Sequence, residues 1–302
     1  MTENDLFRSA LVALIGRPNS GKSTLMNSVL EEQVSIVTSL PQTTRQNIKG
    51  VYTSENMQLV FVDTPGIHKG KYTLNEVMLK EAISVLSDGG IDLICYLVDL
   101  SRDFGEEEST VARIVSGAQI PVLIIFNKSD LCPDPQNRVN QFFQTFPELN
   151  ETAHIQMSAI SADAQKSFLK AVDPFIPQGP QYFDQDSLTD ASMRFLAAEF
   201  IRKQIILNTR EEVPHATYVE IESYKELPQG HEISATIHVE TQGQKGIIIG
   251  NKGALITRIR KAARKEIQNL AGVKVNLSCH VKVSPGWRDN SGFLKFMGIR
   301  PK

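Results

Sequence analysis

The first 170 residues alternate short apolar runs with segments of helical periodicity. The apolar runs, rich in Val, Ile and Leu, are Leu11–Ile15, Leu59–Val62, Leu93–Leu100 and Val122–Phe126. Between them, Leu74–Leu86 and Glu106–Val115 carry apolar residues at helical spacing. Near-continuous apolar strands are expected where helices cover both faces of a parallel sheet. The alternation therefore predicts an α/β, doubly wound fold.

The pattern changes after a segment, residues 173–181, that holds three prolines and a glycine. Such a segment continues neither a helix nor a central strand. We therefore predict a first domain over residues 1–175, a linker over 176–186 and a second domain over 187–302. The elements expected in the second domain are a helix Ser187–Asn208, strands Tyr218–Ile221 and Ile233–Val239, a glycine turn, a helix Ala254–Leu270 and a strand Val273–Val283. The order of helix, strand, strand, helix, helix and strand indicates a smaller α+β domain.

A phosphate-binding motif follows the first apolar run. Residues 16–23 match the pattern G-x-x-x-x-G-K-S/T between an expected strand and an expected helix. The glycines allow backbone N–H groups to point at phosphate oxygens, and the helix adds its positive end. Lys22 is expected to reach the β- and γ-phosphates, and Ser23 to ligate magnesium. The expected nucleotide contacts here are Gly16, Arg17, Pro18, Asn19, Ser20, Gly21, Lys22, Ser23 and Thr24.

A second motif ends the next apolar run. Its residues are Asp63, Thr64, Pro65, Gly66 and Ile67. A carboxylate at the end of a parallel strand beside the phosphate loop can hold magnesium, usually through a water. The Gly66 N–H can meet the γ-phosphate. An Asp-x-Pro-Gly sequence is also a common turn, so its meaning depends on the other motifs.

A third motif is suited to reading a guanine base. It consists of Asn127, Lys128, Ser129 and Asp130, after an apolar run. Asp130 can accept hydrogen bonds from guanine N1–H and the 2-amino group, which adenine lacks, and a buried polar group left unpaired costs about 1–3 kcal/mol. The stem of Lys128 can cover the base, and Asn127 can tie this loop to the phosphate loop. A backbone N–H of Ser158 or Ala159 is expected at guanine O6.

Residues 8–175 resemble a translation-factor-type GTPase domain, and the whole chain is similar to the Era family of bacterial GTPases. Gln42-Thr43-Thr44-Arg45 matches the first switch of that family. The resemblance implies that Thr44 closes over the γ-phosphate and its magnesium. It also implies magnesium-dependent hydrolysis of GTP to GDP and phosphate. The expected catalytic residues are Lys22, Thr44 and Gly66, and the expected metal ligands are Ser23, Thr44 and Asp63.

The residue that positions the attacking water is not evident from the sequence. Ile67 stands where Ras-like proteins carry a glutamine, and an isoleucine cannot hold water by hydrogen bonding. Intrinsic hydrolysis should therefore be slow, with the water held by backbone, by the switch or by a partner. Asn19 resembles an asparagine with which some relatives ligate potassium, so we hypothesise that potassium supports hydrolysis. The alternative is that Asn19 stabilises the turn.

Charge is unevenly distributed along the chain. The net charge is −2 overall, but residues 241–302 hold 13 Lys and Arg against 2 Asp and Glu. Residues 1–180 hold 14 Lys and Arg against 21 Asp and Glu. Such an asymmetry favours a polyanion-binding face, although a solvated basic surface would give the same counts.

The basic region contains a G-x-x-G turn, Gly250–Gly253, of the kind with which KH modules clamp about four unpaired nucleotides. A lone G-x-x-G also occurs in ordinary helix-to-helix turns. An apolar groove for bases is expected from Ile247, Ile248, Ile249 and Ile256. The expected RNA contacts are Ile249, Gly250, Asn251, Lys252, Gly253, Arg258, Arg260 and Lys261.

The family resemblance extends over about residues 195–297. It implies a type 2 KH domain that binds the 3′ end of 16S ribosomal RNA and acts in assembly and maturation of the small (30S) ribosomal subunit. It also implies peripheral contact at the inner face of the cell membrane. Nothing in the sequence suggests an obligate dimer, so a monomer is expected. One departure is Val239–Gly243, where relatives carry a Glu-Arg-x-Ser stretch. The missing arginine could alter affinity for RNA.

Two broader inferences complete the prediction. Cys95, Cys132 and Cys279 lie far apart without zinc-type spacing, which fits a reducing compartment. No secretory signal and no apolar run of roughly 18 residues is evident, so we expect a cytoplasmic protein. The alternatives left open are a GTPase switch whose second domain binds protein or membrane, and a P-loop kinase. The guanine-type motif at residues 127–130 argues against the kinase.

Overall fold

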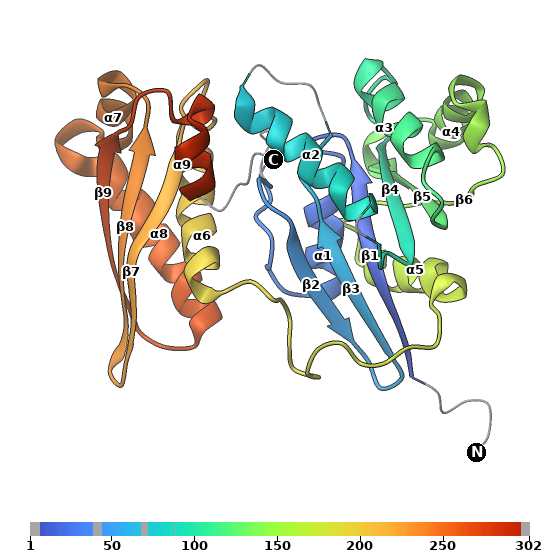
Figure 1. Ribbon diagram of the computed structural model, residues 1–302, viewed down its shortest axis with the longest axis horizontal. Helices are drawn as coiled ribbons and strands as arrows, with labels where there is room; N and C mark the ends of the chain where they lie inside the picture. Colours follow the sequence, from blue (N-terminus) through green and yellow to red (C-terminus); the bar gives the residue numbers. More distant parts are fainter. Residues whose placement is uncertain (1–6, 39–43, 68–71, 88, 297–302) are drawn as a thin grey trace. The chain divides into compact units, whose positions relative to one another are not determined.

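The computed structural model describes residues 7–38, 44–67, 72–87 and 89–296, and the chain divides into two compact units (Figure 1). The main division falls between Asp190 and Ala191, and the short stretch Tyr72–Leu74 groups with the second unit. No helix among the described residues has the length and apolar character required to cross a membrane.

The first unit contains a six-stranded sheet in the order β2-β3-β1-β4-β5-β6. Its strands are β1 Arg8–Gly16, β2 Ile48–Thr53, β3 Met57–Asp63, β4 Leu93–Asp99, β5 Val122–Asn127 and β6 Ala153–Gln156. All neighbours are parallel except β2, which pairs antiparallel with β3. The sequence predicted a parallel sheet and missed β2 and β6. The edge strand β2 mixes buried and half-buried positions, and β6 has four largely exposed residues, so neither has a continuous apolar run.

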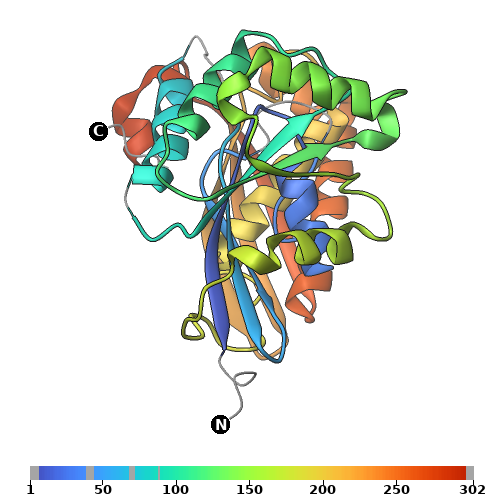
Figure 2. The same ribbon diagram turned by 90° about the vertical axis from the view of Figure 1, so that its right-hand side faces the viewer.

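Helices cover both faces of this sheet (Figure 2). The helices are α1 Lys22–Leu30, α2 Thr73–Ser87, α3 Glu106–Ser116, α4 Pro135–Thr145 and α5 Ala164–Val172, with short 3₁₀ turns at Ser129–Leu131, Pro147–Leu149 and Asp173–Phe175. Ala82, Val111 and Phe142 place α2, α3 and α4 in one core cluster with the sheet. On the other face, the ring of Phe168 in α5 lies 5.6 Å from that of Phe61 in β3. The α/β doubly wound prediction is confirmed.

The second unit has a three-stranded sheet in the order β7-β8-β9. Its elements are α6 Met193–Asn208, β7 Tyr218–Leu227, β8 Gly230–Val239, α7 Gln242–Ile249, η4 Asn251–Gly253, α8 Ala254–Ala271, β9 Val275–Val283, η5 Trp287–Asp289 and α9 Ser291–Phe296. The strands β7 and β8 pair antiparallel, whereas β8 and β9 are parallel. The helices α6, α7 and α8 share one apolar core with the sheet. The predicted order of helix, two strands, two helices and strand is confirmed, and η5 and α9 were missed.

The first helix of the second unit begins later than predicted. We expected it from Ser187, but α6 begins at Met193, where the Ser192 side chain caps the helix by accepting from the Phe195 N–H at 3.2 Å. The preceding backbone is engaged elsewhere, because the Leu188 carbonyl accepts from the β2 residue Val51 at 2.9 Å. A carbonyl bonded to a strand is not available to a helix.

The proline-rich segment before it lies against the first sheet. Gln58 of β3 is fully buried, and its Oε1 accepts from the N–H groups of Tyr182 at 2.8 Å and Phe183 at 3.0 Å. Its Nε2 donates to the Phe183 carbonyl at 3.0 Å. One glutamine therefore satisfies backbone groups that the segment, which forms no helix, cannot satisfy internally. The expected linker at residues 176–186 is thus partly held by the first unit.

Candidate nucleotide site and basic interface

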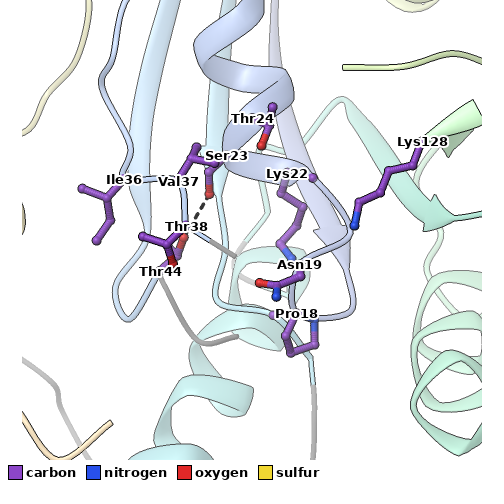
Figure 3. Close-up of a pocket in the computed structure, with 12 residues that line it drawn as sticks. Pro18, Asn19, Lys22, Ser23, Thr24, Ile36, Val37, Thr38, Thr44 and Lys128 are labelled. Carbon is purple, nitrogen blue, oxygen red and sulfur yellow. Dashed lines mark hydrogen bonds between the residues drawn. The ribbon is translucent and has the colours of Figure 1, made fainter. Parts of the chain in front are cut away.

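A cavity of about 280 Å³ lies beside the phosphate loop (Figure 3). It is lined by Pro18, Asn19, Gly21, Lys22, Ser23, Thr24, Ile36, Val37, Thr38, Thr44, Gly66 and Lys128. These residues come from all three predicted motifs and from the segment that leads into the first switch. The structure therefore gathers motifs that are more than 100 residues apart at one edge of the sheet, as expected for strand ends in a doubly wound fold.

Close backbone packing at this edge requires glycine. The backbone of Gly21 is left-handed, with φ of 102°, and a Cβ there would stand 2.1 Å from the Asn127 amide nitrogen. A Cβ on Gly66 would stand 2.6 Å from the backbone of Pro18. Any side chain at either position would push the motifs apart, so these glycines bring the three loops into contact.

The Lys22 ammonium is buried among loop carbonyls. Its Nζ donates to the carbonyls of Gly16 at 3.1 Å and Arg17 at 3.0 Å. Burial lowers the pKa of Lys22 to about 8, although the charges of Asp63 and Glu108 act in the opposite direction. A polyphosphate would offer stronger acceptors to this ammonium than the two neutral carbonyls do.

The three predicted metal ligands meet at one carboxylate. Asp63 is fully buried, and three hydroxyl groups donate to its Oδ2: Ser23 at 2.6 Å, Ser35 at 2.9 Å and Thr44 at 3.3 Å. Its Oδ1 is buried without a partner among the described residues. The hydroxyl oxygens of Ser23 and Thr44 are 3.1 Å apart, and a dashed line in Figure 3 marks this hydrogen bond.

This donor set fits magnesium, which prefers hard oxygen ligands and holds few from the protein. Burial raises the pKa of the Asp63 carboxyl, while Lys22 and the three hydroxyl groups lower it. The orphaned oxygen Oδ1 is the feature that a hydrated cation would satisfy. Two of the predicted switch residues, Gln42 and Thr43, lie outside the described residues.

Asn127 joins the guanine-type loop to the phosphate loop, as predicted. Its Nδ2 donates to the Ser20 carbonyl at 2.8 Å, and its Oδ1 accepts from the Ala159 N–H at 2.9 Å. We expected a backbone N–H of Ser158 or Ala159 to serve guanine O6. Because the Ala159 N–H is engaged by Asn127, guanine would have to share this donor.

The guanine-type loop is anchored by a residue that sequence reasoning missed. Lys128 adopts a left-handed backbone, and its Nζ donates to Asp99 Oδ2 at 2.7 Å. Asp99 is fully buried at the end of β4 and also accepts from Ser101. The sequence did offer a signal for Asp99, because this carboxylate comes near the end of the apolar run Leu93–Leu100. Asp130, which we predicted to read the base, is exposed. Leaving its carboxylate unpaired would therefore cost free energy only where a bound base covers it.

Arg17 does not present its side chain to the cavity. Its Nε lies 2.5 Å from Glu108 Oε2 in a fully buried ion pair, and its Nη1 donates to the Asp103 carbonyl at 3.0 Å. Glu108 also accepts from the Tyr96 hydroxyl at 2.6 Å, and burial raises the pKa of Glu108 against the charge of Arg17. We predicted Arg17 as a nucleotide contact, but Arg17 is not among the residues that line the cavity. The side chain ties the loop to α3.

The remaining residues of the second motif have structural contacts. The Thr64 hydroxyl donates to the Leu14 carbonyl at 2.8 Å, and Pro65 is buried. Ile67 is fully buried in the core cluster shared with α3, and its N–H donates to Gly16 at 3.2 Å. The side chain of Ile67 therefore packs in the core and is not among the residues that line the cavity.

The G-x-x-G turn of the second unit is shaped by left-handed backbone. Gly250, Lys252 and Gly253 have φ of 72°, 50° and 80°. The basic and polar members of the predicted contact set are exposed: Asn251, Lys252, Arg258, Arg260 and Lys261. The structure also places a shallow hollow along α8, lined in part by Arg258 and Lys261.

The predicted apolar groove is smaller than expected. Ile247 is 51% exposed, and Ile249 and Ile256 are half-buried, but Ile248 is fully buried in the core of the second unit. Three consecutive isoleucines on a helix point in different directions, so one of them faces inward. Ile248 is therefore removed from the groove prediction.

The stretch where relatives carry an arginine forms a helix cap in this chain. The Thr241 side chain accepts from the Gln244 N–H at 3.2 Å, and the Gln244 side chain accepts in return from the Thr241 N–H at 3.1 Å. This reciprocal pair is a capping box, which defines the first residue of α7. The departure in sequence thus has a local structural role.

Comparison with known proteins agrees with this organisation. Residues 11–128 match the family model described as a 50S ribosome-binding GTPase, and residues 212–288 match that of a KH domain. The chain is 43% identical to GTPase Era of a Geobacter species, over 97% of this chain and 98% of the relative. It is 41% identical to GTPase Era of Lactobacillus delbrueckii subsp. bulgaricus, over 100% of this chain and 99% of the relative.

Two solved structures are similar over nearly the whole chain. One is Era in complex with MgGDPNP and nucleotides 1506–1542 of 16S ribosomal RNA, with 31% identity, a TM-score of 0.91, and coverage of 98% of this chain and 100% of that chain. The other is a variant of Aquifex aeolicus Era bound to GDP and AlF4−, with 30% identity, the same TM-score and the same coverage.

Proposed function

This chain belongs to the Era family of GTPases, and we propose that it couples GTP binding and hydrolysis to binding of the 3′ end of 16S ribosomal RNA during assembly of the small ribosomal subunit. The proposal rests on the presence of two different sites in one chain. A cavity lined by three nucleotide motifs occupies the first unit, and an exposed basic helix follows a G-x-x-G turn in the second.

For the hydrolysis itself, we propose that Lys22 and the loop N–H groups neutralise the charge of the transferring γ-phosphoryl group. Ser23, Thr44 and Asp63 would hold magnesium, which when bound stabilises charge on the β- and γ-phosphate oxygens. Water attacks the γ-phosphorus, and GDP leaves as phosphate forms. Because Ile67 lies in the core, no side chain at that position orients the water, and intrinsic turnover should be slow.

For the RNA, we propose that the turn at Gly250–Gly253 clamps the backbone of single-stranded nucleotides while Arg258, Arg260 and Lys261 contact phosphates. Left-handed backbone at the turn and exposure of the basic side chains support this. The solved complex of a relative with 16S ribosomal RNA supplies the identity of the RNA.

Further parts of the proposal concern ions and location. We propose that potassium binds near Asn19, which lines the cavity with a left-handed backbone, φ 63°. A location in the cytoplasm is proposed as well, supported by the free thiols Cys95, Cys132 and Cys279. A monomer is proposed because nothing in the sequence suggests an obligate dimer. Peripheral contact at the inner membrane face rests on family resemblance alone.

The test is the affinity for a single-stranded oligonucleotide with the sequence of the 16S 3′ end. Protein loaded with a non-hydrolysable GTP analogue is compared with protein loaded with GDP, and Gly253→Asp serves as the variant. Tighter binding in the GTP-like state, lost in the variant, supports the proposal. Absence of binding in both states would leave the GTPase and would favour a protein- or membrane-binding second unit.

A further inference from the structure

One of the three hydroxyl groups at Asp63 comes from a residue that no nucleotide motif contains. Ser35 is 1% exposed, and its hydroxyl donates to Asp63 Oδ2 at 2.9 Å. Its neighbours Ile36 and Val37 line the nucleotide cavity, so Ser35 lies behind the cavity wall. The hydroxyl groups of Ser23 and Thr44 belong to the predicted metal ligands, whereas the Ser35 hydroxyl contacts the carboxylate and is not among the residues that line the cavity.

Ser35 is held in place by a side chain of α1. The Asn27 Oδ1 accepts from the N–H groups of Val34 at 3.1 Å and Ser35 at 3.0 Å. The Asn27 Nδ2 donates to the Ser35 carbonyl at 2.7 Å. Three bonds from one amide side chain therefore fix both the backbone and the position of Ser35. Asn27 stands on the same helix as Ser23, one turn further along.

We propose that Asn27 and Ser35 are positioning residues for the magnesium site, acting through the Asp63 carboxylate; this inference rests on the proposed role of Asp63 in holding magnesium. The chain of contacts runs from Asn27 to Ser35 and from Ser35 to Oδ2. With Oδ2 anchored, the second oxygen Oδ1, which has no partner among the described residues, keeps one orientation. A carboxylate held in one orientation loses less freedom when it binds a hydrated cation.

Partners of this kind behind a metal site typically change metal affinity about 10- to 100-fold when they are removed. Ser35→Ala removes only the bond to Asp63. Asn27→Ala removes the three bonds that place Ser35. Because both variants act through the same carboxylate, their effects on metal affinity should not add.

The experiment measures release of a fluorescent GDP derivative from the full chain as free Mg²⁺ is varied, with EDTA as the metal-free baseline. The variants are Ser35→Ala, Asn27→Ala and the double variant. Ser116→Ala, which removes an exposed hydroxyl on α3, is the matched control. Ser35→Thr retains the hydroxyl and is the conservative rescue. Thermal unfolding of each GDP-bound variant verifies that it is folded.

The expected result is a 10- to 100-fold rise in the Mg²⁺ concentration that half-maximally slows release, with the EDTA rate unchanged. The double variant should match Asn27→Ala, and Ser35→Thr and the control should match the wild type. A Ser35→Ala curve that superimposes on the wild-type curve overturns the inference. So does an equal rise in release with and without Mg²⁺, because that would indicate general loosening of the site.

One further outcome separates this inference from the proposed function. If release from the wild-type protein does not respond to Mg²⁺ at all, the proposed metal site itself fails, and the positioning role fails with it. If the wild type responds and Ser35→Ala does not differ, only the positioning role is wrong. A Ser35→Ala protein that does not fold is replaced in the test by Asn27→Ala, whose altered side chain lies one step further from Asp63.

Discussion

The main charged residues of the nucleotide site are buried, whereas those of the RNA surface are exposed to solvent. In the first unit, Lys22, Asp63 and Asp99 are buried, and each is held by hydrogen bonds to identified partners. In the second unit, the turn is shaped by left-handed backbone, and Arg258 and Lys261 are exposed. Buried charges interact strongly and individually, whereas exposed charges are screened and act through their sum. Single substitutions should therefore have large effects at the first site and small effects at the second.

The largest expected effect is on stability, at the buried ion pair under the phosphate loop. Glu108→Ala should lower the free energy of unfolding by about 3–5 kcal/mol, because it leaves the Arg17 guanidinium buried without a counter-charge. Glu107→Ala, at an exposed pair with Arg102, should change it by at most about 1 kcal/mol. Denaturant unfolding measures both. Equal changes in the free energy of unfolding for the two variants would contradict the expectation that the buried ion pair matters more than the exposed one.

The next effect is on catalysis. Lys22→Met should lower the GTP turnover number about 100- to 1000-fold, because a preorganised positive charge at the phosphates is lost. Phosphate release under saturating GTP is the measurement. Lys170→Met, on an exposed position of α5, is the control and should retain wild-type turnover. Turnover of Lys22→Met within tenfold of the wild type would contradict the assigned role.

Asp99 should matter for affinity. Asp99→Asn weakens the charge-assisted bond to Lys128, and a loss of about 1.5–3 kcal/mol corresponds to GDP binding that is roughly 10- to 100-fold weaker. Calorimetric titration with GDP measures this. Asp103→Asn is the matched control, because the Asp103 side chain is fully exposed. Equal affinities for the two variants would show that Lys128 does not depend on its buried partner.

A pH dependence should follow from the depressed pKa of Lys22, about 8. Phosphate binding favours the protonated amine, so GDP affinity should be constant below pH 8. Above that pH the free protein loses the proton, and affinity should fall about tenfold per pH unit until the pKa of the bound state is reached. Titrations between pH 7 and 9.5 test this. Lys22→Arg, which stays charged, should remove the dependence, and a wild-type affinity that is flat to pH 9.5 would contradict it.

The smallest effects are expected on the RNA surface. Arg258→Ala and Lys261→Ala should each reduce the slope of log affinity against log salt by about 0.7, as for one lost phosphate contact on a single strand. Affinity at a given salt should fall only a few-fold, while GDP binding stays unchanged. Titrations at several salt concentrations measure the slope. A slope unchanged in both variants would place the RNA on another face.

Much of both units was predictable because their signals are local in sequence. Parallel strands that helices cover on both faces appear as continuous apolar runs. The phosphate-binding loop requires its glycines, lysine and serine at fixed positions in the chain. The edge strand β2 was missed because it is only partly buried, and the start of α6 was misplaced because a cap at Ser192 and strand pairing by Leu188 decide it.

The sequence by itself determined the α/β and α+β order, the three nucleotide motifs and the basic turn, since each depends on residues that are neighbours in the chain. Only the tertiary structure decided which side chains meet. It turned Arg17 away from the cavity toward Glu108, placed Asp99 under Lys128 and brought Ser35 to Asp63. These contacts join residues 28 to 91 positions apart, and no spacing rule relates residues brought together by the packing of separate elements.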